Sequence, residues 1–315
     1  MTTVPHSPAN LAPLRLGTRR SPLAMAQAEE ARARLCAVQG WSLHAVVIVP
    51  VTASGDKTLD RPLAEIGGKA LWTKELDAWL LAGEIDLAVH SAKDVETIRP
   101  DGIVIAAVLP REDVRDVLIG AISIADLPEG ARIGTSAPRR AAQMLHFRPD
   151  CKILTFRGNV ATRLAKLAAG EADATLLAAA GLHRLGRHDI GVPLAVETWL
   201  PAPGQGAIIL ECRANDGAMC SQLGALNHTT SRNTLLAERA LLAALGGNCH
   251  SAIGVVTQSE GDDLVMHAAL FSSDGQDRVD GQVRFVAGTL HGPADLGADL
   301  LGRAAPSIRA LFEGP

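Results

Sequence analysis

The stretch R-L-G-T at residues 15–18 decides the fold, because it returns as R-I-G-T at residues 132–135. Each copy has the character of a buried strand and leads past a proline into an alanine-rich helical pattern. Each helical pattern contains a glutamine, Gln27 in the first and Gln143 in the second. This repetition indicates that one strand-to-helix unit occurs twice in the chain.

A second pair of stretches repeats in the same order. G-E-I-D at 83–86 and G-E-A-D at 170–173 each follow an amphipathic helical pattern that stops at a glycine, and each precedes an apolar strand. The motif is short, so chance similarity is the alternative explanation. Two repeats in the same order favour a duplicated α/β architecture.

The remaining pattern divides the chain near residue 210. Before it, strands alternate with helical patterns, which predicts βα units and mostly parallel sheets. The segment P-A-P-G-Q-G at 201–206 has the character of a rigid crossing between domains, followed by a strand at 207–210. The later part predicts a small α+β unit. Its elements are a helix at 231–245, strands at 253–258, 264–271 and 282–286, and a final helical stretch interrupted at Pro306.

Composition limits the classes of function and the compartment. The formal net charge of −4 argues against a nucleic-acid partner or an anionic membrane surface, so anion binding must come from local clusters. Five cysteines without a C-x-x-C pair argue against a disulfide framework or a zinc site and fit a reducing cytosol, and the histidines lack metal-ligand spacing. Residues 1–13 lack the pattern of a secretory signal and predict a disordered lead. We therefore expect a cytoplasmic protein without metal or membrane span, and a monomer because no apolar helix face stands out.

Three predicted strand-to-helix junctions carry arginines. They are R-R-S-P at 19–22, G-T-S-A-P-R-R at 134–140, and R-G-N at 157–159 before a helix that carries Arg163. Free backbone N–H groups and the helix dipole favour an anion at such junctions, which gather beyond the carboxyl ends of the strands in an open α/β fold. Taken singly, each junction could be a solvated basic turn. Together they predict a cleft for a ligand with several carboxylates.

One carboxylate belongs to this predicted cleft. H-S-A-K-D at 90–94 places Lys93 and Asp94 at the end of the other repeated strand. In a cleft rich in arginine, an acid is required where a cation must be stabilised or a proton moved, although a surface Lys–Asp turn is the plain alternative. The glycine-containing stretch G-G-K-A-L-W at 67–72 suits a mobile flap. Cys249 follows a Gly-Gly-Asn loop, where a thiol is reachable but the pattern alone implies no reactivity.

In combination these segments resemble the hydroxymethylbilane synthase family, also called the porphobilinogen deaminase family. The resemblance runs in order from about residue 14 to the end of the chain. The matching stretches lie at 15–24, 67–76, 86–95, 111–116, 134–140, 157–164, 180–186, 201–207 and 246–249.

The resemblance implies an α/β fold with two similar type II periplasmic-binding-protein-like domains and a small α+β C-terminal domain. We expect domain 1 at 14–110 plus 205–225, domain 2 at 111–204 and domain 3 at 226–315. It also implies a reaction that joins four porphobilinogen molecules head to tail with loss of ammonia. The growing chain starts from a dipyrromethane cofactor, itself made from substrate.

The resemblance also assigns roles to single residues. Asp94 matches the catalytic aspartate, which stabilises the cationic azafulvene-like species left when the amine departs, and Cys249 matches the thioether attachment of the cofactor. Positions matching cofactor contacts are Lys93, Ser136, Arg139, Arg140 and Arg163. Positions expected at the incoming substrate are Arg19, Ser21, Arg157, Lys69, Trp72 and Gln205.

Some residues depart from the family pattern, and two other classes of function share some features. Ala137 and Pro138 stand where the family often has Ser and Leu, so one hydroxyl contact to a carboxylate is missing. Trp72 stands where Phe is usual, and Ala70 replaces a frequent glycine. A solute-binding protein would share the two-lobed architecture but has no use for Asp94 and Cys249 together. A nucleic-acid binder is opposed by the net charge and by the lack of aromatic residues among the arginines.

Overall fold

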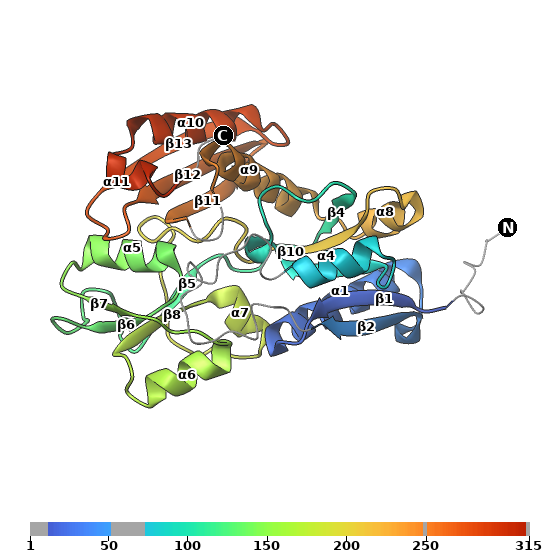
Figure 1. Ribbon diagram of the computed structural model, residues 1–315, viewed down its shortest axis with the longest axis horizontal. Coiled ribbons are helices and arrows are strands. Elements are labelled where there is room, and N and C mark those ends of the chain that lie inside the picture. The colour runs from blue at the N-terminus through green and yellow to red at the C-terminus, as the bar shows by residue number, and fades with distance from the viewer. Residues whose placement is uncertain (1–11, 52–72, 248–250, 313–315) are drawn as a thin grey trace.

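The computed structural model describes residues 12–51, 73–247 and 251–312. They form three parts, each built on its own sheet (Figure 1). Two parts are five-stranded sheets with helices packed on them, and the third is a three-stranded sheet covered by two helices. The expected class, two similar α/β units followed by a smaller α+β unit, is confirmed.

The first sheet has the strand order β2-β1-β3-β10-β4. Its core is aliphatic and includes Leu16, Leu35 and Leu87, each with no exposed surface. Helix α1 packs along β1, β2 and β3, while α4 and α8 also contact this sheet. The strands are β1 (Leu14–Arg19), β2 (Val46–Val51), β3 (Leu87–Ser91), β4 (Ile103–Val108) and β10 (Ile208–Arg213), and the helices are α1 (Pro22–Gln39), α4 (Lys74–Leu81) and α8 (Gly217–Gly224).

The second sheet repeats this order as β7-β6-β8-β5-β9. In both sheets a strand from a segment that crosses between the lobes is inserted beside the third strand of the unit. This shared order confirms the type II periplasmic-binding-protein architecture expected for the two lobes. The strands are β5 (Asp116–Ile119), β6 (Arg132–Gly134), β7 (Lys152–Leu154), β8 (Ala174–Ala178) and β9 (Val192–Pro193), and the helices are α5 (Pro138–Phe147), α6 (Val160–Ala168) and α7 (Ala179–Arg184).

The expectation of mostly parallel sheets is only partly correct. Each of the two sheets has two parallel and two antiparallel pairings. The reversed strand is β10 in the first sheet and β5 in the second. Each arrives from the opposite lobe through a crossing segment, so it runs against the strands that the local βα units supply.

The two repeated sequence stretches meet in space. In the first lobe, Arg15 donates to Asp86 from its backbone N at 2.7 Å and from its guanidinium at 3.1 and 2.8 Å. In the second lobe, Arg132 makes the same set of bonds to Asp173, at 2.7, 3.2 and 2.8 Å. The duplication is thus visible at the level of single hydrogen bonds.

Two segments cross between the lobes, residues 109–115 between β4 and β5 and residues 194–207 between β9 and β10, and they bind each other. The N–H of Glu112 donates to the carbonyl of Gly206 at 3.2 Å, and Arg111 Nε donates to the carbonyl of Gln205 at 2.8 Å. Glu238, fully buried on α9 (Thr229–Leu245), accepts both terminal nitrogens of Arg111 at 2.8 and 2.9 Å and the N–H of Gly204 at 2.7 Å. The third part therefore fixes the place where the two lobes are joined.

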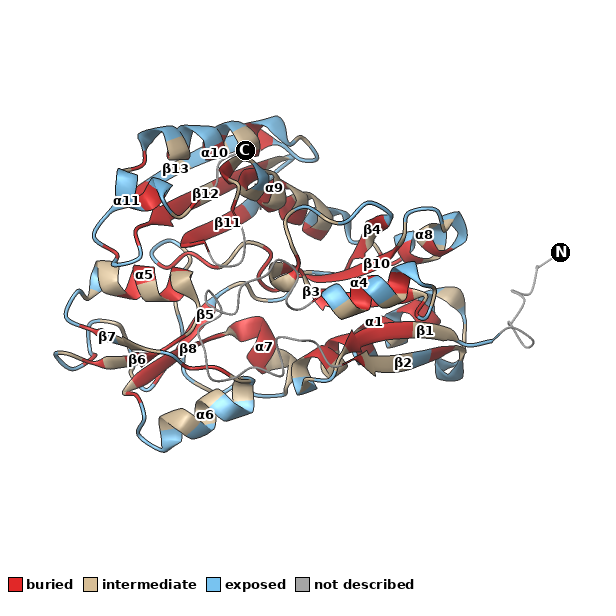
Figure 2. Cartoon of the chain, viewed as in Figure 1, coloured by how far each residue is buried: buried red, intermediate tan, exposed pale blue. Residues whose placement is uncertain are grey.

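The third part packs α9 and α10 (His291–Arg303) on an antiparallel sheet of β11 (Ile253–Glu260), β12 (Asp263–Phe271) and β13 (Arg278–Val286). Strand β13 begins four residues before the expected strand at 282–286. The short α11 (Pro306–Arg309) starts at the predicted interruption. Figure 2 shows buried strands under helices whose outer faces are exposed, as on α6 and α10.

Most of the expected disordered lead lies outside the described residues, and the domain limits stay predictions. Among the residues that are described, no helix combines the length and apolar character required to cross a membrane.

We predict that Gly206→Ala destabilises the protein by roughly 2–5 kcal/mol. Gly206 has φ +84°, and an added Cβ would lie 2.4 Å from the carbonyl oxygen of Glu112 in the other crossing. Gly130, at φ +68° with open space around it, is the matched control and should cost only about 1–2 kcal/mol when changed to Ala. Urea unfolding measures the loss of stability in both variants. Equal losses would contradict the close approach between Gly206 and the Glu112 carbonyl.

Candidate active site

A cavity of about 640 Å³ lies where the two lobes and the third part meet. Its wall includes residues at or just beyond the carboxyl ends of β1, β3 and β8, and residues that follow β6 and β7. The crossing segment before β10, helix α9 and the start of β11 complete the wall. The strand-to-helix junctions predicted from the sequence therefore converge on one cavity.

The first junction is built as expected. Ser21 is the N-cap of α1, and its hydroxyl accepts from the N–H of Ala24 at 3.3 Å. Arg19 ends β1 and points its Nη1 to within 3.9 Å of Asp94 Oδ2. Both Arg19 and Asp94 line the cavity.

Asp94 is placed by the strand that precedes it. Strand β3 ends at Ser91, and a short 3₁₀ turn, Ala92–Asp94, carries the lysine and the aspartate to the cavity wall. The Asp94 side chain is 38% exposed, so the carboxylate remains open to a ligand. Val95, immediately after it, is buried in an apolar cluster with Leu235 of α9.

The second and third junctions differ in how their helices begin. Ala137 stands at the N-cap of α5, where no side chain caps the helix. Asn159 caps α6 and accepts from the N–H of Thr162 at 2.9 Å. Arg163 then donates to the carbonyl of Gly158 at 3.0 Å and approaches Ser136 Oγ at 3.4 Å.

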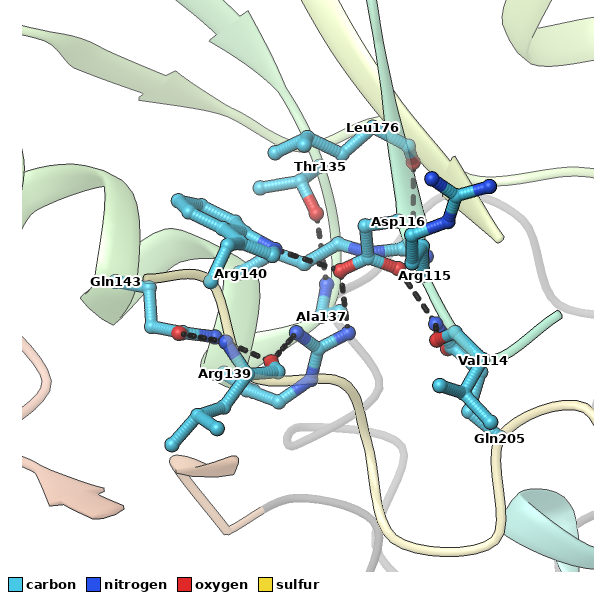
Figure 3. Close-up of polar contacts among 12 residues, drawn as sticks. Val114, Arg115, Asp116, Thr135, Ala137, Arg139, Arg140, Gln143, Leu176 and Gln205 are labelled. Atoms are coloured by element: carbon cyan, nitrogen blue, oxygen red, sulfur yellow. Dashed lines mark hydrogen bonds and ion pairs between the residues drawn. The ribbon is translucent and has the colours of Figure 1, made fainter. Parts of the chain in front are cut away.

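A buried carboxylate, Asp116, organises the next set of cationic side chains (Figure 3). Its two oxygens accept from Arg139 at 2.8 Å and from Arg140 at 2.7 Å, and Asp116 has no exposed surface. Trp199 Nε1 and Gln205 Nε2 donate to the same carboxylate at 2.8 Å each. Burial alone would raise the Asp116 pKa, but the charges of both arginines and these hydrogen bonds hold the pKa far below its usual range.

The same network reaches Lys93 through Gln205. Lys93 Nζ donates to Gln205 Oε1 at 3.2 Å, while the amide nitrogen of Gln205 binds Asp116 and the carbonyl of Val114. Burial, and then the charge of Arg140, lower the pKa of Lys93 to about 8. Burial and the same neighbour lower the pKa of Arg163 to about 10. Both cations are thus buried and lie close to a third, an arrangement that a bound carboxylate would stabilise.

The described residues that we predicted from the sequence all line this cavity. They are Arg19, Ser21, Lys93, Asp94, Ser136, Arg139, Arg140, Arg157, Arg163 and Gln205. Lys69, Trp72 and Cys249 lie outside the described residues. Ser251, two positions after Cys249, is described and lines the cavity.

Three residues of the site were missed. Arg184 at the end of α7 and Arg239 on α9 line the cavity, and Asp116 supports it from behind. Arg184 and Asp116 fall within stretches that resemble the family, at 180–186 and 111–116, but nothing in the sequence gave them a role. Arg239 reads as an ordinary polar position of an amphipathic helix.

Comparison with known proteins gives the same family twice along the chain. Residues 14–221 match "Porphobilinogen deaminase, dipyromethane cofactor binding domain", and residues 233–304 match "Porphobilinogen deaminase, C-terminal domain". The chain belongs to the porphobilinogen deaminase family. The first of the two matched regions corresponds to the family's dipyrromethane-binding domain, and it contains both five-stranded sheets.

Relatives in the porphobilinogen deaminase family cover almost the whole chain. The porphobilinogen deaminase of Sphingopyxis alaskensis is 56% identical over 95% of this chain and 96% of its own. That of Paracoccus denitrificans is 46% identical over 96% and 97%, and the chloroplastic protein of Oryza sativa is 46% identical over 85% and 76%. Among solved structures, the periplasmic VFT2 domain of Bordetella pertussis BvgS is similar, with a TM-score of 0.40 and 16% identity over 72% of this chain and 92% of that chain.

We predict that Asp116→Asn destabilises the protein by roughly 3–5 kcal/mol, because two buried arginines lose their counter-charge. Asp150→Asn is the matched control. Its ion pair with Arg148 is exposed to solvent and should contribute far less than the buried pairs of Asp116.

The pH dependence checks the cause of this loss. Because the folded pKa of Asp116 is depressed, its contribution is present above the unfolded pKa of about 3.9 and is lost as the pH falls through the folded pKa. The free energies of unfolding of wild type and Asp116→Asn, measured with urea, should therefore differ by the same amount from pH 5 to 8. The difference should become smaller only below about pH 4. A difference that vanished near neutral pH would rule out a charged Asp116.

Proposed function

We propose that the chain is a hydroxymethylbilane synthase, a transferase of tetrapyrrole biosynthesis. It joins four porphobilinogen molecules one after another on an enzyme-bound dipyrromethane and releases ammonia and linear hydroxymethylbilane. Family membership over nearly the full chain supports this activity. The observation that carries the proposal is one cavity whose wall contains Asp94 together with cationic side chains from both lobes and from α9.

The residues present fit a dipyrromethane. Its two rings carry four carboxylates, and Lys93, Arg139, Arg140 and Arg163 supply four cations on the wall of the cavity. Arg140 has a buried Nε with no hydrogen-bond partner among the described residues, so it keeps a donor for a carboxylate. Ser136 adds a hydroxyl beside Arg163. When bound, the dipyrromethane supplies the ring position to which the first substrate is joined.

Asp94 is proposed as the catalytic residue. Loss of ammonia leaves positive charge on the substrate ring, and a fixed carboxylate beside the ring stabilises that charge. The short turn after β3 holds Asp94 in place, and its partial exposure allows contact with a ring N–H. Arg19 Nη1, 3.9 Å from the Asp94 carboxylate, helps to hold that carboxylate beside the proposed substrate position.

The incoming porphobilinogen carries an acetate and a propionate. Arg19 and Ser21 at the first junction and Arg157 at the third are proposed to bind them, and all three line the cavity. Lys69 and Trp72 stay predicted substrate contacts. Gln205 also stays one, although the bonds of its amide to Lys93 and Asp116 support a role in orienting Lys93.

The attachment of the cofactor through Cys249 is a further part of the proposal. Its support is the position of the cysteine in the sequence between α9 and Ser251, both of which contribute to the cavity wall.

We also propose a cytoplasmic monomer. The free thiols Cys36, Cys151, Cys212 and Cys220 are consistent with a reducing compartment.

We predict that Asp94→Asn keeps the fold but lowers kcat by about 100- to 1,000-fold, because one preorganised charge contact is lost. Steady-state assays of porphobilinogen consumption measure this effect, and circular dichroism checks the fold. Asp101→Asn, in an exposed turn of the same lobe, is the control and should turn over normally. A wild-type kcat in Asp94→Asn would reject the proposed role.

We predict that Cys249→Ala purifies without a covalent adduct, whereas wild type carries two linked pyrrole units in its intact mass. Cys220→Ala should keep the adduct, because Cys220 lies beside Cys212 behind the first sheet and is not on the cavity wall. An unmodified mass from an active wild-type preparation would contradict the proposed attachment.

A further inference from the structure

A second buried charge cluster lies beyond the cavity wall, behind Asp94. Its centre is the Arg99 guanidinium, with the side chain only 7% exposed. Nε and Nη2 bind the two oxygens of Glu211 on β10 at 2.8 Å each, and Nη1 binds Glu96 at 2.8 Å. Nη2 also binds Asp77 of α4 at 2.5 Å. One arginine thus joins a strand, a helix and the segment that follows Asp94.

The same segment is held from its other side by the third part. Arg239 of α9 donates to the carbonyls of Glu96 and Thr97 at 2.5 and 2.7 Å. The hydroxyl of Thr97 donates to the carbonyl of Gly247 at 2.9 Å, at the end of α9 and two residues before Cys249. Residues 95–99 therefore bridge the first sheet and the chain that leads to the proposed attachment point.

We infer that Arg99 is a positioning residue, which fixes residues 95–99 and thereby sets the position of Asp94 relative to α9 and Gly247 of the third part. The inference rests on the proposed function, because it takes Asp94 as the catalytic carboxylate and Cys249 as the attachment. Arg99 itself is not on the cavity wall, so it acts only through the segment that it holds.

The chemistry of the cluster explains why an arginine is required. Asp77, Glu96 and Glu211 place three carboxylates around one point, and burial raises the pKa of Asp77 and of Glu211. A guanidinium has N–H donors on three nitrogens in a rigid fork, so one arginine can serve all three carboxylates, which the compact ammonium of a lysine does not match. His90 brings its Nε2 to 3.5 Å from Glu211, and Asp77, His90 and Glu211 have the spacing of metal ligands. Arg99 donates to both carboxylates of that group, so their negative charge already has a cationic partner in the protein.

The test compares Arg99→Met with Arg213→Met in the full-length protein loaded with its cofactor. Arg213 ends β10 in the same lobe, and its side chain binds the carbonyls of Leu80 and Ile85 and the carboxylate of Asp216, with no hydrogen bond to residues 95–99 among the described residues. We expect Arg99→Met to carry the covalent adduct, to keep KM within about twofold, and to lose roughly 10- to 100-fold in kcat, since small displacements of a catalytic group have effects of that size. Arg213→Met should lower the melting temperature yet keep kcat.

Asp77→Asn keeps the test decisive if Arg99→Met does not fold. Asp77 is off the cavity wall, and among the described residues its side chain reaches the segment through Arg99, so this variant should also lower kcat more than KM. Wild-type kcat in the folded, loaded variants would overturn the inference, as would an equal kcat loss in Arg213→Met. If wild type itself lacks the adduct or the turnover, the proposed function fails instead.

Discussion

The interaction on which the cavity depends is the buried pairing of Asp116 with Arg139 and Arg140. A site for several carboxylates must gather cations, and gathered cations repel each other where water is excluded. Asp116 supplies a counter-charge behind the wall, and Trp199 and Gln205 complete its hydrogen bonds. The carboxylate thereby joins β5, α5 and the crossing segment, so the charge balance and the geometry of the site have the same origin.

The fold could be predicted as far as local patterns determine it. The repeats of R-L-G-T and G-E-I-D predicted two similar lobes, because buried strands and helix ends have local sequence patterns. Their pairing into the bonds of Arg15 with Asp86 and of Arg132 with Asp173 could not be foreseen, since it depends on which strands become neighbours. The reversed strands were missed for the same reason. The direction of these strands is set by the crossing between the lobes, and the hydrophobic periodicity of a strand does not depend on its direction.

The residues of the candidate site could likewise be predicted only in part. Side chains at strand-to-helix junctions were found because parallel strands bring their carboxyl ends together. Asp116 and Arg99 were not found, because their partners are distant in sequence. Asp116 meets residues 23 to 89 positions away, and Arg99 meets Glu211 across 112 positions. Such contacts follow from the packing of whole elements, and Arg239 on α9 joins the site only when the third part docks on the lobes.

Three carboxylates without exposed surface, Asp116, Glu211 and Glu238, each bind arginine and so join separate elements of the chain. Buried ion pairs add little net stability compared with apolar packing, whereas removing one partner costs several kcal/mol. Stability alone therefore does not explain their placement. Asp116 fixes the second lobe to a crossing segment, Glu238 fixes both crossings to α9, and Glu211 fixes the segment after Asp94 to the first sheet. Because each pair has directional geometry, it tolerates little sliding between the elements that it joins. A cavity assembled from three separate parts requires that kind of constraint, and apolar contacts alone do not supply it.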